Sequence, residues 1–282
     1  MAYRDLLFAV LTYPDATPAA AIRAGAALAR RLGGEVTALA LAVDIPSLHN
    51  RLANALAGLD KLAEQEEARS AALAEQAARC FTAAAAETGL LATAIVERAP
   101  MHAEAERICA HARTRDLTLF PLGPAVLEDR ALAEAALFGS GRPILVFPES
   151  GCVGDGEAFG KAAIAWDGSP RAARAVADAL PALKRCEEVR ILIVTGEKPT
   201  VAGGGALDLV RHLKTHGIDA QVDEVAAGGE PIGRVIETYV GERWIELLVM
   251  GGFGRPRAQE FVLGGATASV LEAPPCPVLL SH

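Results

Sequence analysis

The sequence lacks the features that mark membrane and secreted proteins. No stretch approaches the roughly 20 uncharged apolar residues that a membrane-spanning helix needs. Near the N-terminus there is only a short apolar run, residues 6–11, with no basic region before it and no small-residue cleavage site of the signal-peptide kind. We therefore expect a soluble protein of the cytoplasm.

Clustered cysteines and an excess of basic residues are also missing. The five cysteines are scattered and none forms a Cys-x-x-Cys pair, which argues against a disulfide framework or a zinc site. His212 and His216 stand four residues apart without the intervening Glu of a metalloprotease motif, so we expect no metal site. The net charge of −8 argues against nucleic acid or an anionic membrane as a partner, because both reward a basic surface.

Length and composition fit two domains. Apolar residues make up 51% of the 282 residues, enough for each half of the chain to bury a core. A Gly-rich polar stretch at residues 150–156 is typical of a linker. We predict one domain over residues 1–149 and a second over residues 159–282.

Both halves show the same alternation of apolar strands and amphipathic helices. The segments predicted in the first half are residues 6–11, 18–32, 36–43, 52–88, 92–97, 102–112, 117–122 and 142–147. The segments predicted in the second half are residues 162–166, 170–183, 189–194, 206–216, 220–225, 232–240, 247–250 and 276–280. Ser169 is the expected N-cap of one helix, while Gly89 and Gly217 are expected just after the ends of two others.

Several of the predicted strands are apolar without interruption. Such runs indicate burial on both faces, which is typical of a parallel sheet with helices on each side. The sequence therefore predicts an α/β protein with two tandem doubly wound domains, each built on a five-stranded parallel sheet.

The richest candidate site follows the fourth strand of the second half. Ligands of such sheets bind beyond the carboxyl ends of the strands. Here the strand runs into a Gly-rich segment that ends at Gly264-Gly265, just before a helix predicted to begin near Ala266. Free N–H groups at a helix start can bind phosphate, and Arg255 can add a charged contact. These residues also have a purely structural interpretation, because glycines are common in ordinary loops and residues 167–170 are a good sequence for a turn and a helix start.

The spacing of these residues resembles that of the universal stress proteins. Their pattern after strand four is Gly, two residues, Gly, nine residues and Gly, which Gly251, Gly254 and Gly264 reproduce. Pro277-Val278 in the closing strand and Asp167-Gly168-Ser169 after strand one also fit. The resemblance covers essentially the whole second half of the chain.

The resemblance implies an adenine nucleotide α-hydrolase-like fold and a stress-response regulatory protein that binds ATP or a related adenine nucleotide, with Mg²⁺ as its companion. It implies no catalytic residue and at most slow ATP hydrolysis. Together with Arg255, the nucleotide-binding positions are Ala165, Asp167, Val194, Met250, Gly251, Phe253, Gly254, Gly264, Gly265, Ala266 and Thr267.

Two departures from the family pattern stand out. The family has Ser or Thr where this chain has Gly265, and Thr267 is the hydroxyl that remains. In the first half Gly123 is followed by Pro124, with no second glycine at the required spacing. Residues 138–140, Phe-Gly-Ser, look like a remnant of the third glycine with no room for a helix after it. We expect the first half to be a degenerate copy that serves as a scaffold.

Two other functions stay open. The chain can be a nucleotide-free protein-interaction and signalling module, which the missing hydroxyl at Gly265 favours. It can also be an adenylating ligase, although strand one is not followed by the Ser-Gly-Gly loop that such enzymes need. The apolar closing strands, residues 144–147 and 278–280, are consistent with an intramolecular pseudo-dimer, and a homodimer of two chains stays open.

Overall fold

The computed structural model describes residues 2–45, 59–123, 127–150, 156, 158–196, 205–252 and 265–282. The elements of the first half are β1 (Asp5–Val10), α1 (Ala19–Leu32), β2 (Glu35–Asp44), α3 (Leu59–Thr88), β3 (Ala92–Pro100), the 3-10 helix η1 (Met101–Ala103), α4 (Glu104–Ala112), β4 (Leu117–Leu122), α5 (Leu127–Gly139) and β5 (Ile144–Pro148). The elements of the second half are β6 (Lys161–Ala165), α6 (Pro170–Leu183), β7 (Glu188–Thr195), α7 (Ala206–Thr215), β8 (Ala220–Ala226), α8 (Ile232–Arg243), β9 (Leu247–Gly251), α9 (Ala266–Glu272) and β10 (Val278–Ser281).

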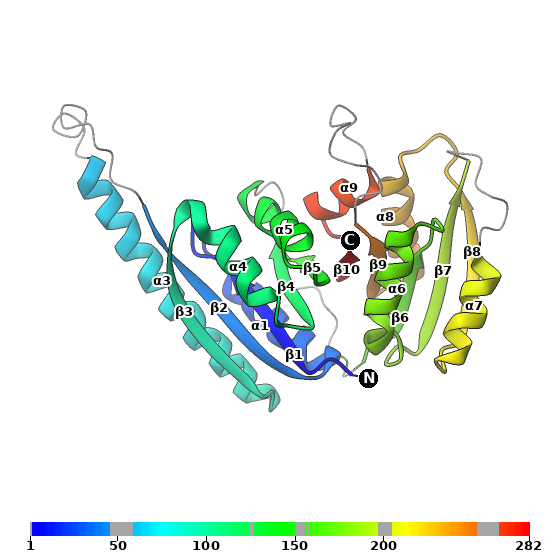
Figure 1. Cartoon of the computed structure of the whole chain (residues 1–282), viewed down its shortest axis with the longest axis horizontal. Helices are drawn as coiled ribbons and strands as arrows, with labels where there is room; N and C mark the ends of the chain where they lie inside the picture. Colours follow the sequence, from blue (N-terminus) through cyan, green and yellow to red (C-terminus); the bar gives the residue numbers. More distant parts are fainter. Residues whose placement is uncertain are drawn as a thin grey trace.

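The described strands form one ten-stranded sheet in the order β3-β2-β1-β4-β5-β10-β9-β6-β7-β8. Within each half the five strands are parallel, and both halves use the same order. Figure 1 shows the two halves side by side along this sheet. The predicted α/β fold with a doubly wound parallel sheet in each half is confirmed.

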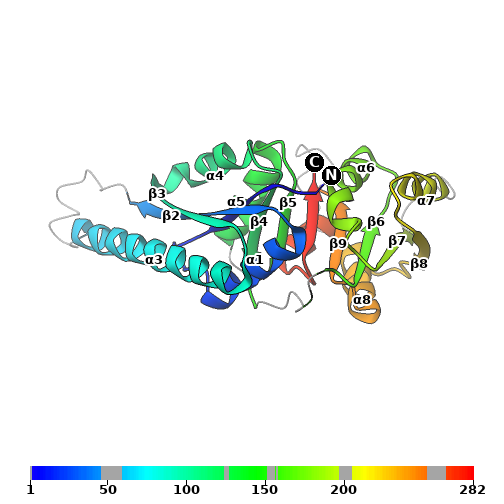
Figure 2. The same cartoon turned by 90° about the horizontal axis from the view of Figure 1, so that it is seen from below.

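The two halves join through their closing strands. β5 and β10 are antiparallel, and Leu145 pairs with Leu279 at the centre. On either side of that pair, Ile144 faces Leu280 and Val146 faces Val278, so the register is symmetric. Figure 2 shows β5 and β10 next to each other between the two sets of helices.

Helices cover both faces of the sheet, as the continuous apolar strands require. One hydrophobic core lies between the sheet and α1, α3, α6 and α7. The other lies between the sheet and α4, α5, α8 and α9. β4 is buried along its whole length. Among the described helices, none has both the length and the apolar character that crossing a membrane requires.

A buried cation also ties the halves together at the amino ends of their sheets. The Arg31 guanidinium pairs with Glu246 and donates a hydrogen bond of 2.8 Å to the Ala158 carbonyl oxygen. It lies 4.2 Å above the ring centre of Phe159. Since Arg31 comes from α1 and its partners come from the chain after residue 150, this contact fixes the relative position of the halves.

Most predicted turns are found where the sequence placed them. Gly89 and Gly217 have positive φ angles of 67° and 80° just after helices, as expected of residues that end a helix. The Ser169 hydroxyl oxygen accepts a hydrogen bond of 3.1 Å from the Ala172 amide, which confirms the predicted N-cap. The predicted start of the long helix at residue 52 lies outside the described residues.

One prediction for the first half is wrong. Residues 138–140 are not a remnant of the third glycine of the motif, because Phe138 and Gly139 are the last residues of α5 and do not precede a helix. A helix that follows a parallel strand begins at the carboxyl edge of the sheet and returns to the amino edge. Gly139 and Ser140 therefore lie at the amino edge of the first-half sheet, opposite the carboxyl ends of its strands.

Candidate functional site

The predicted site residues come from separate elements that end at one edge of the second-half sheet. Ala165 is the last residue of β6, and it pairs with Leu192 of β7 and Met250 of β9. Val194 lies near the end of β7, where it pairs with Val225 of β8. Because these strands are parallel, all of their carboxyl ends lie at the same edge.

An apolar floor lies at this edge. It consists of five half-buried side chains that pack on the core beneath α8 and α9, namely Ala165, Val194, Val225, Ile232 and Ala266. Three of the five were predicted as site residues, and Val225 and Ile232 were not. Met250, also predicted, is only 5% exposed and belongs to the core below the floor. A half-buried apolar surface of this kind suits the flat face of a nucleobase.

Asp167 is exposed directly after β6, at the side of the floor. Its Oδ1 accepts a hydrogen bond of 2.9 Å from the Ser169 amide. This bond closes a turn around Gly168, whose φ is 73°, and leads into the N-cap of α6. One carboxylate oxygen of Asp167 therefore has a local structural role.

Gly251 and Gly252 end β9 in tight packing. A Cβ atom on Gly251 would come within 2.7 Å of the Ala172 amide nitrogen and 2.8 Å of the Arg171 carbonyl carbon. A Cβ atom on Gly252 would come within 2.8 Å of a methyl group of Leu137 from α5. The backbone of α6 thus requires glycine at position 251, whereas at position 252 the atom in the way belongs to the end of the Leu137 side chain.

The first turn of α9 contacts the end of β9 at Gly251. Thr267 is 5% exposed, and its hydroxyl donates a hydrogen bond of 3.5 Å to the Gly251 carbonyl oxygen. Gly265 precedes the helix with φ −72° and ψ 142°, and a Cβ atom on it would meet no atom of the described residues within 4 Å. The position of the missing hydroxyl is therefore open, whereas the hydroxyl of Thr267 is buried.

Four predicted site residues lie outside the described residues, namely Phe253, Gly254, Arg255 and Gly264. The structure thus places the remaining eight: Ala165, Asp167, Val194, Met250, Gly251, Gly265, Ala266 and Thr267. Among the described residues, no group of three or more His, Cys, Asp or Glu side chains is arranged to hold a metal ion.

The corresponding edge of the first half has different residues at the same places. Thr118 pairs with Ile144 in the first half as Leu248 pairs with Val278 in the second. This register puts Pro121 and Leu122 where the second half has Gly251 and Gly252. Gly123, which the sequence suggested as the counterpart of Gly251, therefore lies two residues beyond the equivalent position, Pro121.

The positions that form the apolar floor are covered in the first half. By the same register, Ala9 and Leu41 correspond to Ala165 and Val194. Ala9 and Leu41 are both 0% exposed, whereas Ala165 and Val194 are half-buried. The side chains at these two positions are therefore fully covered in the first half and partly exposed to solvent in the second.

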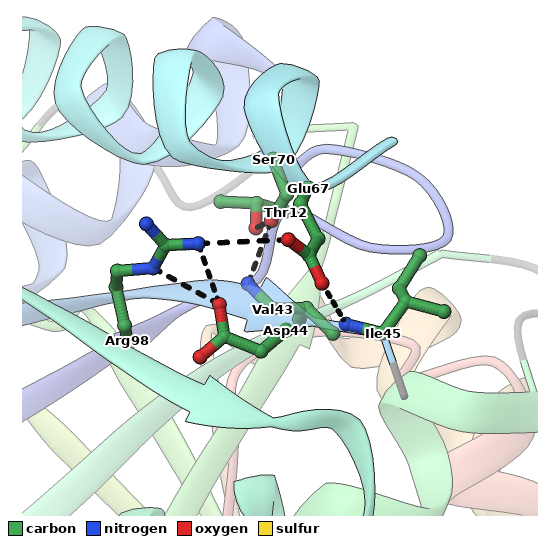
Figure 3. A network of polar contacts seen from close by, with 7 residues as sticks. All are labelled: Thr12, Val43, Asp44, Ile45, Glu67, Ser70 and Arg98. Carbon is green, nitrogen blue, oxygen red and sulfur yellow. Dashed lines mark hydrogen bonds and ion pairs between the residues drawn. The ribbon is translucent and has the colours of Figure 1, made fainter. Parts of the chain in front are cut away.

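Helix α3 is bonded to the ends of β1 and β2. The Thr12 hydroxyl lies 2.6 Å from the Ser70 hydroxyl of α3, and the Ser70 oxygen also accepts a hydrogen bond of 2.9 Å from the Val43 amide. Arg98 of β3 pairs with Asp44 of β2 at 2.6 Å and with Glu67 of α3 at 3.9 Å, as Figure 3 shows. These contacts fasten α3 over the first-half sheet.

Five carboxyl groups gather at the carboxyl edge of the first half. They belong to Asp15, Glu104, Glu128, Asp129 and Glu149. Burial and the nearby Asp129 raise the pKa of Glu104 to about 7, and burial followed by Glu149, Glu128 and Asp15 raises the pKa of Asp129 to about 7. Each of the two has one buried oxygen with no hydrogen-bond partner among the described residues. This edge of the first half is therefore lined by acids, two of which are buried and keep their protons to about pH 7.

The second half has glycines and an apolar surface at the carboxyl edge of a parallel sheet, which is the edge where α/β sheets bind their ligands. Residues 158–282 match the sequence model of the universal stress protein family. The second half of this chain is a universal stress protein domain.

Solved structures show that the likeness in fold extends over the whole chain. A universal stress protein from Archaeoglobus fulgidus DSM 4304 matches 98% of this chain over 96% of its own, with 18% identity and a TM-score of 0.66. A protein from Pseudomonas aeruginosa UCBPP-PA14 matches 99% of this chain over 93% of its own, with 15% identity and a TM-score of 0.53. A search of curated proteins gave no match.

A further solved structure is a universal stress protein in complex with cAMP. It matches 44% of this chain over 98% of its own, with 22% identity and a TM-score of 0.34. That likeness is too low to carry an argument about this chain.

Proposed function

We propose that this chain is a stress-response regulatory protein that binds ATP or a related adenine nucleotide in its second half, at residues 159–282. The first half, residues 1–149, is a scaffold, and the two halves form an intramolecular pseudo-dimer about β5 and β10. The observation that supports the proposal is the apolar floor, in which Ala165, Val194 and Ala266 from three elements are half-buried on the same hydrophobic core.

The residues present fit a nucleotide in part. The adenine would lie on the apolar floor, and the backbone amides near Gly265 and Ala266 would face the phosphates. The free side of the Asp167 carboxylate would accept hydrogen bonds from the ribose. Any Mg²⁺ would be held mainly by the phosphates, because the described residues offer no ligand cluster of their own.

Isothermal titration of the full chain with ATP tests the proposal. We expect a saturable heat signal with one nucleotide per chain, and a melting temperature that rises as ATP is added. GTP at the same concentrations serves as the control for base recognition. No heat at high micromolar ATP, together with an unchanged melting temperature, would contradict the proposal.

A second candidate function is a nucleotide-free interaction module. Two predicted ligand groups already have partners within the protein, and this favours the alternative. Asp167 accepts a hydrogen bond that closes a local turn, and the buried Thr267 hydroxyl donates to the Gly251 carbonyl oxygen. In that case mass spectrometry of the denatured, freshly purified protein should detect no released nucleotide. Detection of a stoichiometric adenine nucleotide would exclude this alternative.

A further inference from the structure

The turn formed by Gly251 and Gly252 lies between the two halves of the molecule. The Gly252 amide donates a hydrogen bond of 2.7 Å to the Ser281 carbonyl oxygen of β10. On its other side, a methyl group of Leu137 occupies the space that any side chain at position 252 would need. Leu137 is 2% exposed and belongs to α5, a helix of the first half. A first-half side chain therefore packs directly on the turn that begins the site.

His282 makes a second connection between α5 and this turn. Its ring packs edge-on against the Phe138 ring, with a centroid distance of 4.7 Å and an interplanar angle of 78°. Its Nδ1 lies 3.3 Å from the Gly252 carbonyl oxygen and 3.2 Å from the Arg171 Nε. The imidazole thus bridges α5, the Gly252 peptide and the first turn of α6.

The opposite side of the turn is held by the second half itself. The closeness of Gly251 to the backbone of Arg171 and Ala172 leaves no room for a side chain, and Thr267 hydrogen-bonds the Gly251 carbonyl. The turn is therefore enclosed between α6 and α9 of its own half and α5 of the other. A displacement of α5 would release one side of it.

We propose that the first half positions the Gly251–Gly252 turn of the second half, with Leu137, Phe138 and His282 as the positioning residues. This inference rests on the proposed nucleotide binding and adds its regulation, because anything that moves α5 would change the shape of the site. The first half is then an intramolecular regulator of a site to which it contributes no ligand contact.

The contact between Leu137 and Gly252 can be tested by a double-mutant cycle on ATP affinity in the full chain. Gly252→Ala alone pushes the turn away from Leu137, and Leu137→Ala alone removes the support, so each should weaken ATP binding about tenfold. In the double variant the new methyl group enters the space that the leucine left. We expect its affinity to return to within about threefold of the wild-type value.

If the two substitutions instead weaken ATP binding independently, the double variant will bind about a hundredfold more weakly than the wild type, and this result would overturn the proposal. Leu137→Met, which keeps the packing volume, should retain affinity. Leu132→Ala is the matched control, because Leu132 is a half-buried residue of α5 on the same core. It should leave ATP affinity unchanged.

Hydrogen exchange of the Gly252 amide, measured without nucleotide, separates this inference from the proposed function. Leu137→Ala and His282→Ala should speed its exchange about tenfold while the amides of β7 keep their wild-type rates, and Leu132→Ala should not. Faster exchange in a protein that binds no ATP would support the positioning and refute the nucleotide proposal. Unchanged exchange in a protein that binds ATP would refute the positioning alone.

Discussion

The two halves place the same strands in the same order, yet their carboxyl edges differ. In the first half Ala9 and Leu41 are fully covered, and α3 is bonded over the ends of β1 and β2. In the second half the corresponding Ala165 and Val194 are half-buried at an open floor. The backbone ladder is shared, so the difference lies in the side chains and in what covers them.

Charge separates the two edges as well. Glu104 and Asp129 are 6% and 9% exposed in the first half, with Asp15 and Glu149 beside them. At the second-half edge Asp167 follows β6 and Glu230 follows β8, and both carboxylates are exposed rather than buried. A repeat can therefore keep its fold while the residues at its carboxyl edge change.

Among substitutions that test the difference between the two edges, the largest effect is expected at Gly251. Gly251→Ala introduces a Cβ atom 2.7 Å from the Ala172 amide nitrogen, so α6 and β9 must move apart. We expect the free energy of unfolding to fall by about 1–3 kcal/mol and ATP affinity to fall about tenfold to a hundredfold. Urea unfolding and calorimetric titration measure both quantities.

Pro121→Ala, at the equivalent position of the first half, is the control for that substitution. It should leave ATP affinity within about twofold of the wild-type value, because the first-half edge takes no nucleotide in this account. An equal loss of affinity from both substitutions would mean that the two edges are not functionally different.

The buried acids of the first half predict a pH dependence of stability. In the folded chain Glu104 keeps its proton to about pH 7, whereas in the unfolded chain a glutamate loses it near pH 4. The folded state therefore binds more protons in this window, and the contribution of Glu104 to stability is lost as the pH rises from about 4 to 7. Compared with the wild type, Glu104→Gln should gain roughly 2 kcal/mol between pH 5 and pH 8.

Urea unfolding of both proteins at pH 5, 6, 7 and 8 measures this difference. Asp129→Asn should show the same direction, since its pKa is raised in the same way. Glu242→Gln, at an exposed position of α8, is the control and should show a flat difference. A flat difference for Glu104→Gln as well would contradict the buried acid pair.

A gain of affinity is expected at Gly265. The position has an ordinary φ of −72°, and no described atom lies within 4 Å of an added Cβ, so Gly265→Ser fits without displacing a described neighbour. The new hydroxyl can donate to a phosphate, and we expect ATP affinity to rise about threefold to tenfold with unchanged stability. Gly265→Ala lacks the hydroxyl and should give no gain, which calorimetric titration of both variants would show.

The smallest effect is expected at Asp167. Asp167→Asn keeps an oxygen that can accept from the Ser169 amide, so the turn and the start of α6 should persist. A decrease in ATP affinity of about threefold, with an unchanged melting temperature, would then report the contact of the carboxylate with the nucleotide. Unchanged affinity would leave Asp167 with its role in the turn alone.

The fold was largely predictable from the sequence because its signals are local. Continuous apolar runs marked the strands, and Ser169, Gly89 and Gly217 marked the helix ends. The error over α5 came from treating residues 138–140 as a ligand motif, since a Gly-Ser pair can equally follow a helix end. The symmetric register of β5 and β10 depends on contacts between distant segments, which sequence spacing does not contain.

The site was predictable only in part. Ala165, Val194 and Ala266 were assigned through the family pattern, and they do lie on one apolar floor. Val225 and Ile232 were missed, although Val225 stands next to Val194 in the sheet and its place at the end of a predicted strand was the available signal. The packing of Leu137 on Gly252 joins residues far apart in the chain and left no signal in one sequence.

The central claim is that the second-half edge, and not the first, binds an adenine nucleotide. Hydrogen exchange of the full chain with and without millimolar ATP tests it most directly, because both edges are read in one experiment. We predict slower exchange in peptides that contain Asp167, Gly252 and Ala266, and no change in peptides that contain Thr12 and Asp129. No protection at the second-half edge, or equal protection at both edges, would contradict the account.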